Sequence, residues 1–334
     1  MILRRKRQTI PVLWGSVSLR LSAVSVVLLV TAALAVGFFF DRGRSEALRQ
    51  RELEHLRLHA ERGADELAHL VRRLQWDVLF LSATPPIEGI SRALVGGGTD
   101  YVGGSSLAQW ETRLQQIFLA FARARPEYAQ LRLIGTRDGA RELVRVDRTA
   151  EGLRVTPPDE LQRKGDRYYF REASRLAPGM VYFSRTDLNR EQGVISTPLQ
   201  PTLRVATPVH DATGNLFAVV VLNMDMGQAF EGVASYRDPA ETLYIVDERG
   251  DFLLHPDPSV AFAFEFGEPF RLADAFPDHA ERVLAVRPGG GTYFELPGDD
   301  GARLAYATVR DFDPSDATRR LIVILTEPTD QLLE

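Results

Sequence analysis

A run of twenty uncharged, mostly apolar residues near the N-terminus constrains this chain more than any other feature. The run extends from Leu21 to Phe40. An α-helix rises about 1.5 Å per residue, so a helix of this length spans roughly 30 Å, which is the thickness of the hydrocarbon core of a bilayer. The sequence therefore predicts one transmembrane helix over residues 21–40.

The charges that flank this run predict its orientation. Five basic residues precede or begin it: Arg4, Arg5, Lys6, Arg7 and Arg20. Positively charged flanks stay in the cytoplasm, so we expect residues 1–20 to be cytoplasmic and the residues after Phe40 to be outside. A cleaved secretory signal is the alternative, but its apolar region is only about 7–15 residues long and ends in small residues. The bulky Phe38–Phe40 favours an anchor.

Composition excludes several classes of function. The 334 residues have a hydrophobic content of 45% and a charged content of 25%, as in ordinary globular proteins, and the length predicts more than one domain. A net charge of −5 argues against a nucleic-acid partner. The sequence has no cysteine, so disulfides, thiolate metal sites and a cysteine nucleophile are excluded.

Residues 41–83 are predicted to form a long stalk helix. Apolar residues recur at spacings of three and four along it: Leu53, Leu56, Ala60, Ala64, Leu67, Val71, Leu74, Val78 and Leu81. This pattern is typical of a helix with one apolar stripe, and we expect the stalk also to pack along the domain, as an ordinary amphipathic helix does. The seven-residue repeat next to a membrane also indicates a parallel homodimer through the stalk. Pro85 and Pro86 are expected to end the helix.

The rest of the chain predicts an α+β fold with two antiparallel-sheet modules. A second helix is expected from Trp110 to about Arg125, and a short one from Asp166 to Arg175. Runs with a period of two follow in two sets, each a strand–turn–strand, then irregular or helical sequence, then three strands. The first set is 130–134, 142–146, 180–184, 203–209 and 216–224, and the second is 243–246, 252–255, 291–296, 304–309 and 320–325.

Two stretches carry a resemblance to a known family. Residues 160–226, which include RYYFREA and LRVATPVHDATGNLFAVVVLNMDM, resemble the membrane-distal half of a double Cache domain. The segment YIVDERGDFLLHPDP, residues 244–258, resembles the start of the membrane-proximal half. The resemblance implies two PAS-like modules on a long N-terminal helix, with a distal module at 84–231, a proximal module at 232–328 and the start of an exit helix at 329–334.

Such domains are extracytoplasmic sensors of bacterial histidine kinases, chemoreceptors and diguanylate cyclases. The resemblance therefore implies a receptor of the bacterial inner membrane whose main domain is periplasmic or extracellular. We expect this region not to be an enzyme, and we expect the cytoplasmic output, a histidine kinase or a diguanylate cyclase, to be absent from this sequence.

The resemblance also implies a ligand site in the distal module. Amino-acid-binding members carry Arg-x-Trp-Tyr-x-x-Ala there, with an Asp at the end of the last distal strand. This chain has Arg167, then Tyr169 in place of the Trp and Phe170 in place of the Tyr, and it ends the strand with Asp225. An arginine can hold a carboxylate and an aspartate an ammonium. The full set of candidate ligand-binding residues is Arg167, Tyr169, Phe170, Tyr182, Ser184, Arg204 and Asp225.

Structural roles for the same residues stay open at this point. Arg167 and Asp225 could form a salt bridge or a strand-end cap, and the aromatic residues could be core packing. Loss of a hydroxyl at Phe170 removes one hydrogen bond that an amino acid would receive. Arg167 and Asp225 still predict a small carboxylate or an amino acid as the ligand.

No catalytic residue, metal site or cofactor is predicted. His55 and His59 lie at helical spacing suited to a metal, but no HExxH pattern accompanies them, and we interpret them as part of a solvated helix face. His255 is interpreted as the end of a strand, and Asp311 and Asp313 as parts of a hairpin loop.

Two other functions remain as alternatives to a sensor of small molecules. One is an ectodomain that binds a partner protein and has no small-molecule pocket, for which a large exposed apolar patch would be the sign. The other is a membrane-anchored hydrolase, which needs a nucleophile and base that the sequence does not offer.

Overall fold

The computed structural model describes residues 14–298, 301–313, 316 and 318–329. The chain divides into two compact units, residues 1–54 and 55–334. Residues 1–13 of the expected cytoplasmic segment and the expected exit helix beyond residue 329 lie outside the described residues.

Helix α1 (Trp14–Ser82) contains both the expected transmembrane stretch and the expected stalk in one helix. In the first unit its large apolar side chains are exposed along Val24–Phe40, and Phe39 is 71% exposed. Among the described residues, this is the one helix that is long and apolar enough to cross a membrane. The exposure suits a lipid environment, because apolar side chains and internally bonded backbone are what a spanning helix presents.

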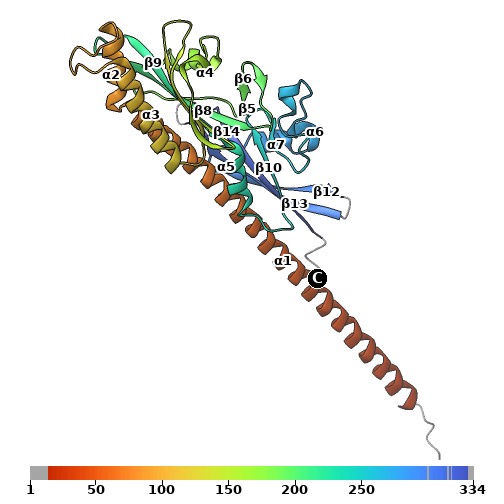
Figure 1. The fold of residues 1–334 in the computed structure, drawn as a ribbon. Helices are drawn as coiled ribbons and strands as arrows, with labels where there is room; N and C mark the ends of the chain where they lie inside the picture. Colours follow the sequence, from red (N-terminus) through yellow and green to blue (C-terminus); the bar gives the residue numbers. More distant parts are fainter. Residues whose placement is uncertain (1–13, 299–300, 314–315, 317, 330–334) are drawn as a thin grey trace, which may run out of the picture. The chain divides into compact units, whose positions relative to one another are not determined.

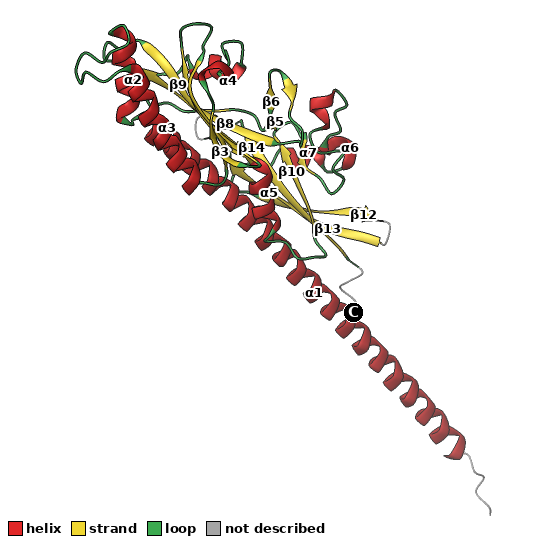
Figure 2. Ribbon diagram, in the orientation of Figure 1, coloured by secondary structure: helices red, strands yellow, loops and turns green. Residues whose placement is uncertain are grey.

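The second unit is built in layers around two antiparallel sheets. Figures 1 and 2 show residues 55–82 of α1 running along one side of both sheets. Helices α4 (Tyr168–Ala173), α6 (Leu272–Ala275) and α7 (Ala280–Leu284) lie on the other side. Helices α2 (Pro85–Val95) and α3 (Leu107–Ala124) pack together, and α3 contacts β1 and β2 beside α1. The predicted α+β class with two antiparallel sheets is confirmed.

The first sheet has the strand order β3-β2-β1-β9-β8-β4, with β5 pairing with β8. Its strands are β1 (Tyr128–Gly135), β2 (Glu142–Thr149), β3 (Gly152–Val155), β4 (Tyr182–Phe183), β5 (Asp187–Leu188), β8 (Pro201–His210) and β9 (Leu216–Asp225). A separate hairpin joins β6 (Arg190–Glu191) to β7 (Val194–Ile195). Helices α4 (Tyr168–Ala173) and α5 (Met226–Ala234), with the short 3-10 turn η1 (Pro158–Glu160), complete this part.

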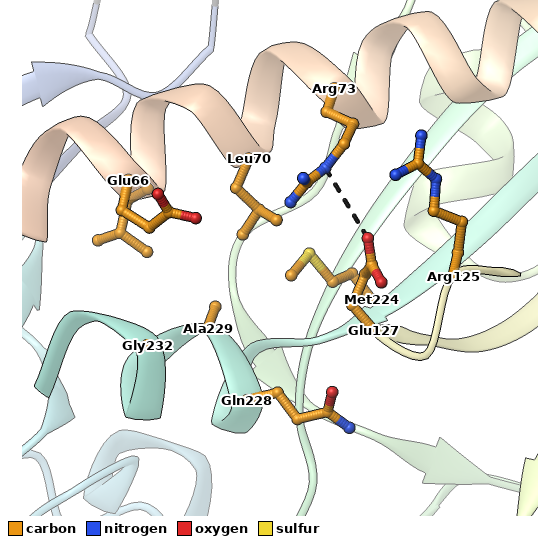
Figure 3. Close-up of a pocket in the computed structure, with 10 residues that line it drawn as sticks. Glu66, Leu70, Arg73, Arg125, Glu127, Met224, Gln228, Ala229 and Gly232 are labelled. Atoms are coloured by element: carbon orange, nitrogen blue, oxygen red, sulfur yellow. Dashed lines mark ion pairs between the residues drawn. The ribbon is translucent and has the colours of Figure 1, made fainter. Parts of the chain in front are cut away.

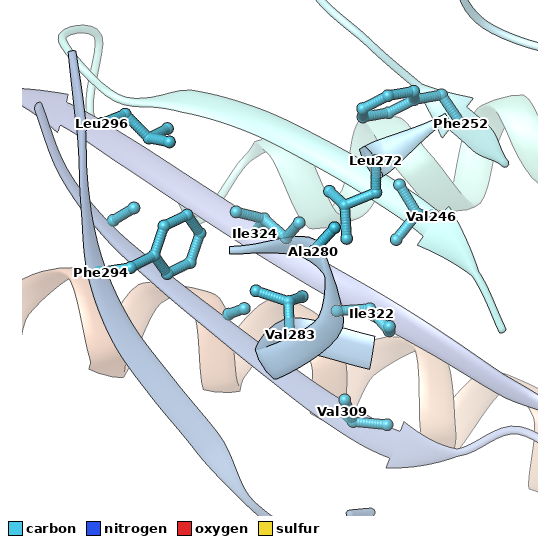
Figure 4. Packing of buried hydrophobic residues seen from close by; sticks show 12 residues of the cluster. Val246, Phe252, Leu272, Ala280, Val283, Phe294, Leu296, Val309, Ile322 and Ile324 are labelled. Atoms are coloured by element: carbon cyan, nitrogen blue, oxygen red, sulfur yellow. The ribbon is translucent and has the colours of Figure 1, made fainter. Parts of the chain in front are cut away.

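The second sheet has the order β11-β10-β14-β13-β12. Its elements are β10 (Thr242–Asp247), β11 (Phe252–Leu254), η2 (Ala263–Phe266), α6 (Leu272–Ala275), α7 (Ala280–Leu284), β12 (Gly291–Gly298), β13 (Gly301–Asp311) and β14 (Arg320–Pro328). Figure 4 shows how Leu272, Ala280 and Val283 pack onto the apolar face of the sheet, among side chains such as Phe294 and Ile324. This face of the second sheet is therefore filled by the chain's own apolar residues.

The apolar stripe predicted for the stalk is buried within the chain. Every member from Leu56 to Leu81 is at most 4% exposed. Polar contacts add to this packing: the Tyr128 hydroxyl donates to Asp77 at 2.7 Å, and the Tyr306 hydroxyl donates to Glu61 at 3.1 Å. From Leu56 onward, the seven-residue repeat is thus accounted for by packing against the chain's own sheets, and it gives no support to a dimer.

Some local expectations were wrong. The Pro85–Pro86 pair follows the end of α1, but it also begins α2, because proline is favoured in the first turn of a helix. Helix α3 starts three residues before Trp110 because Ser106 and Gln109 form a capping box. The expected strand at 180–184 is reduced to β4, and the strand β3 and the helix α5 were not predicted.

The contact between Gly89 and Trp110 gives a test of how α2 packs on α3. A Cβ atom at Gly89 would lie 2.3 Å from the indole ring, whereas a Cβ at Gly232 of α5 would meet nothing within 4 Å. Gly-to-Ala in a helix normally stabilises by about 1 kcal/mol. We expect Gly232→Ala to raise the melting temperature of the full chain in detergent. Gly89→Ala should lower it, because overpacking costs about 1–3 kcal/mol. Equal shifts in the two variants would contradict the packing.

Candidate functional site

A row of polar side chains crosses the middle of the first sheet on the side that faces α4. Strand register aligns Arg204, Asn223, Gln130 and Asp147 on four successive strands, β8, β9, β1 and β2. Gln130 donates to Asp147 at 2.6 Å, and Asn223 donates to Gln130 at 3.2 Å. We call these four residues the polar row. Buried polar side chains are costly unless they are paired, so a continuous row in a sheet interior marks this face as specialised.

Arg132 lies two residues after Gln130 on β1, so its side chain is on the same face of the sheet as the polar row, and it is 2% exposed. It donates to the Asn223 side chain at 2.7 Å and to the Tyr169 hydroxyl at 2.9 Å. Its nearest carboxylate is Glu142 at 3.6 Å, and its buried Nε has no acceptor within the described part of the chain. The site thus holds a buried guanidinium whose hydrogen-bonding capacity is not fully used.

Tyr169 of α4 is the centre of a cluster of cations. The guanidinium carbons of Arg132, Arg204 and Arg167 lie 5.2, 5.4 and 5.9 Å from the centre of its ring. Burial alone would raise the pKa of the Tyr169 hydroxyl, but Arg132, Lys164 and Arg204 lower it below its usual value. The potential at this hydroxyl is therefore positive enough to favour an anion.

Lys164 adds a fourth cation beside this cluster. Its side chain is 6% exposed and donates to Gln162 at 2.6 Å. Within the described residues no carboxylate lies within ion-pair distance of it. Burial, together with the charge of Arg132, lowers the pKa of the Lys164 ammonium. An ammonium held beside arginines in this way would be stabilised by an incoming negative charge.

Residues 185–200, which include β5, β6 and β7, lie over the polar row, and we call them the covering segment. Arg204 forms an ion pair with Asp187 of this segment, and Arg145 of β2 forms one with Glu191 at 3.3 Å. Between the covering segment and the sheet lies a pocket of about 510 Å³. The side chains of Gln130, Asp147, Arg145, Asn189, Glu191, Asn223 and Asp225 line it. A pocket of this size and polarity suits a small polar molecule.

The structure gathers several of the predicted site residues, though not all of them. Tyr169 and Phe170 belong to one buried cluster, and Tyr182 packs against it. The Arg167 guanidinium makes no ion pair or hydrogen bond within the described residues, although it lies near the Tyr169 ring.

Ser184 and Asp225 have structural contacts. The Ser184 hydroxyl accepts from the backbone N–H of Arg204 at 2.9 Å and so joins β4 to β8. Asp225 caps α5 by accepting from the Gly227 N–H at 2.8 Å, and Gln200 donates to its other oxygen at 3.2 Å. Asp225 nevertheless lines the pocket, and it is the one predicted ligand-binding residue that does so. The others, Arg167, Tyr169, Phe170, Tyr182, Ser184 and Arg204, do not line it.

A second pocket, of about 310 Å³, lies between α1 and α5. Figure 3 shows Leu70 and Arg73 of α1 facing Ala229 and Gly232 of α5, with an ion pair from Arg73 to Glu127 at 3.8 Å. None of the predicted ligand-binding residues lines this pocket. Both of its arginines have a carboxylate partner, Arg73 with Glu127 and Arg125 with Asp77 at 3.6 Å, so it offers less to an anion than the cluster around Tyr169.

The histidine pair on α1 is not the solvated face that we expected. His55 is half exposed, but the His59 side chain is only 11% exposed and contacts the buried Glu241. The two rings lie one helical turn apart, as their spacing predicts, but the partner of His59 comes from a segment about 180 residues later, which spacing alone does not reveal.

Comparisons with known proteins agree on one class. Residues 99–294 match a family model described as the sensor domain of bacterial histidine kinases. No curated protein sequence matches the chain significantly.

Solved structures of sensor domains share the fold. A domain of a protein described as a sensory box/GGDEF family member from Vibrio parahaemolyticus superposes with a TM-score of 0.67 and 19% identity, covering 87% of this chain and 100% of that one. The extracellular domain of a protein described as the histidine kinase vpHK1S-Z8 gives 0.67 and 18%, covering 87% and 95%. The sensory domain of the Campylobacter jejuni chemoreceptor Tlp3, with isoleucine bound, gives 0.52 and 9%, covering 87% and 98%.

The cation cluster predicts that Tyr169 ionises before the other tyrosines of the folded chain. Its pKa is lowered, so its proton leaves below the usual pH of about 10. The stabilisation from ionised Tyr169 is therefore present above pH 10 and is lost as pH falls through the lower folded-state pKa. We expect the first tyrosinate absorbance in a native pH titration to disappear in Tyr169→Phe and to persist in Tyr101→Phe, whose ring is 67% exposed. Persistence of the first component in Tyr169→Phe would contradict the assignment.

Proposed function

Because the chain belongs to the family of bacterial histidine kinase sensor domains, we propose that it recognises a small organic carboxylate, which includes amino acids, outside the cytoplasm. The observation that carries this proposal is the set of four cations, Arg132, Lys164, Arg167 and Arg204, around Tyr169. None of them lines the pocket, but Arg132 donates to Asn223, which does. Two of these cations, Lys164 and Arg167, have no carboxylate within ion-pair distance among the described residues. A ligand carboxylate would supply the missing negative charge.

We also propose that residues 84–231 form the ligand-binding module and residues 232–328 a second module without a ligand. The apolar packing of α6 and α7 on the second sheet supports this division, since it fills the face that corresponds to the pocket side of the first sheet. The exposed apolar stretch of α1 supports placement in the bacterial inner membrane. The basic residues before it support an orientation with the residues after Phe40 outside.

The pocket also has groups that suit an amino group. Asp225 and Asp147 line it, and Asp225 has one polar side-chain contact, from Gln200, besides its capping bond. A zwitterion could therefore place its carboxylate toward the cations and its ammonium toward these acids. The bound isoleucine of the Campylobacter jejuni domain supports including amino acids in the proposal.

The covering segment connects the pocket to the second sheet, so a change in it on ligand binding would reach that sheet. Arg185 pairs with Asp247 of β10 at 2.7 Å, and Arg190 pairs with Glu265 of η2 at 2.7 Å. A ligand that shifts the covering segment would therefore change the contacts of the second sheet. It can act only if it binds the shifted arrangement better than the original one.

Arg167→Ala tests the proposal at a cation whose removal should cost the fold little. We expect the full chain in detergent to show a rise in melting temperature with at least one compound from a panel of L-amino acids and small mono- and dicarboxylates. A compound at 100 times its Kd stabilises by about 2.7 kcal/mol. The rise should be lost in Arg167→Ala and kept in Arg171→Ala, because Arg171 is exposed on the same helix.

Three outcomes would contradict the proposal. No compound of the panel raises the melting temperature, or a hit persists in Arg167→Ala, or Arg167→Ala unfolds the chain without any compound. The first outcome favours a partner protein as the recognised molecule, the second a pocket elsewhere, and the third a structural role for Arg167.

A further inference from the structure

A separate cluster of potential metal ligands joins α1 to the segment between α5 and β10. His55 and His59 lie one helical turn apart on α1, and Asp238 and Glu241 come from the loop that precedes β10. One potential ligand atom from each of the four residues can be chosen so that all lie within 4.8 Å of one another. The four side chains thus converge from two segments that are distant in the sequence.

Two distances within the cluster are close to those between the ligand atoms of a tetrahedral site. His59 Nδ1 lies 3.0 Å from Glu241 Oε1, and His55 Nδ1 lies 3.6 Å from Asp238 Oδ2. Zinc binds imidazole nitrogen and carboxylate oxygen at about 2.0–2.1 Å, so neighbouring ligand atoms in a tetrahedron lie about 3.3 Å apart. Wider separations can close by rotation of His55 and Asp238, which are 47% and 54% exposed.

The buried half of the cluster is held in place by the backbone around it. The Glu241 side chain is fully buried, and its Oε2 accepts from the Asp238 N–H at 2.7 Å. Arg237 donates to the Glu241 carbonyl at 2.8 Å, and the Glu241 N–H donates to the Asp238 carbonyl at 3.0 Å. These bonds fix the loop so that both carboxylates face α1, which is the role of outer-shell contacts in metal sites.

The chemistry of the four side chains selects the class of ion. The imidazole rings lie 4.1 Å apart between their centres, so two protonated histidines would repel each other. Two neutral imidazoles with two carboxylates instead form a donor set for a first-row divalent cation, whereas Mg²⁺ and Ca²⁺ prefer oxygen ligands alone.

We propose that His55, His59, Asp238 and Glu241 bind one divalent transition-metal ion of the Zn²⁺ class. The ion would fasten the segment that connects the two sheets to α1. It lies apart from the Tyr169 cluster and shares no residue with it, so the proposal is independent of the carboxylate ligand.

Zn²⁺ titration of the full chain, without a histidine tag and freed of metal by a chelator, tests this site. We expect Zn²⁺ to raise the melting temperature and Mg²⁺ at the same concentration to leave it unchanged. The affinity for Zn²⁺, measured by calorimetry, should fall at least tenfold in His55→Ala and in Asp238→Asn. It should be unchanged in His69→Ala, because His69 is exposed on α1 outside the cluster. Co²⁺ should give the visible absorption of a tetrahedral complex.

Several results would overturn the proposal. These are no rise with Zn²⁺, an equal rise with Mg²⁺, an unchanged affinity in both cluster variants, or an equal loss in His69→Ala. Both substituted side chains are half exposed, so the metal-free melting temperature should change little. If one variant fails to fold, the affinity of the other still decides.

Discussion

Burial of the apolar stripe of α1 is the interaction on which both sheets depend. From Leu56 to Leu81 one face of the helix is covered by the chain itself, and each large side chain buried in this way contributes roughly 1.5–3 kcal/mol. Hydrogen bonds reach the same helix from β1, through Tyr128, and from β13, through Tyr306. A single rigid element therefore serves as the packing surface for two sheets. A change in either sheet alters the contacts of the same helix, and this sharing explains why a stalk of such length is also a core element.

The α+β fold could be predicted because strands and helices that bury one face must have apolar residues at regular spacing. Period-two runs predicted the main strands, and the three-four spacing predicted the helix that packs on them, because burial of one face imposes both periods. Short elements were missed where local chemistry competes with these patterns. Pro85 and Pro86 can follow the end of one helix or form the first turn of the next, and the proline pair alone does not distinguish the two. Helix α5 follows β9 directly and is capped by Asp225, a residue that the family resemblance had assigned to a ligand.

The candidate site was only partly predictable, for a similar reason. The family motif identified Tyr169 and Arg167, and alternation on β8 identified Arg204, since these residues lie in recognisable segments. Arg132 and Asn223 were missed, although each is a polar residue inside an apolar strand. They come together only because β1 pairs with β9, which brings residues about 90 positions apart to hydrogen-bond distance. The signal was present in the sequence as polar residues at buried strand positions, but its meaning depends on strand order.

The covering segment shows how recognition and transmission can use the same few residues. Asp187 and Glu191 face the first sheet, where they neutralise Arg204 and Arg145, while Arg185 and Arg190 turn the other way, to Asp247 and Glu265 of the second sheet's elements. In the proposed function, a carboxylate that enters the pocket would compete with Glu191 for Arg145, which lines it. Weakening that pair would loosen residues 190–195 from the first sheet and leave the pairs to the second in place, while β5 stays paired with β8. Acidic residues of this short segment thus pair with the first sheet and basic residues with elements of the second. A negatively charged ligand would weaken one of the first set of pairs and so shift the equilibrium between two arrangements of the segment.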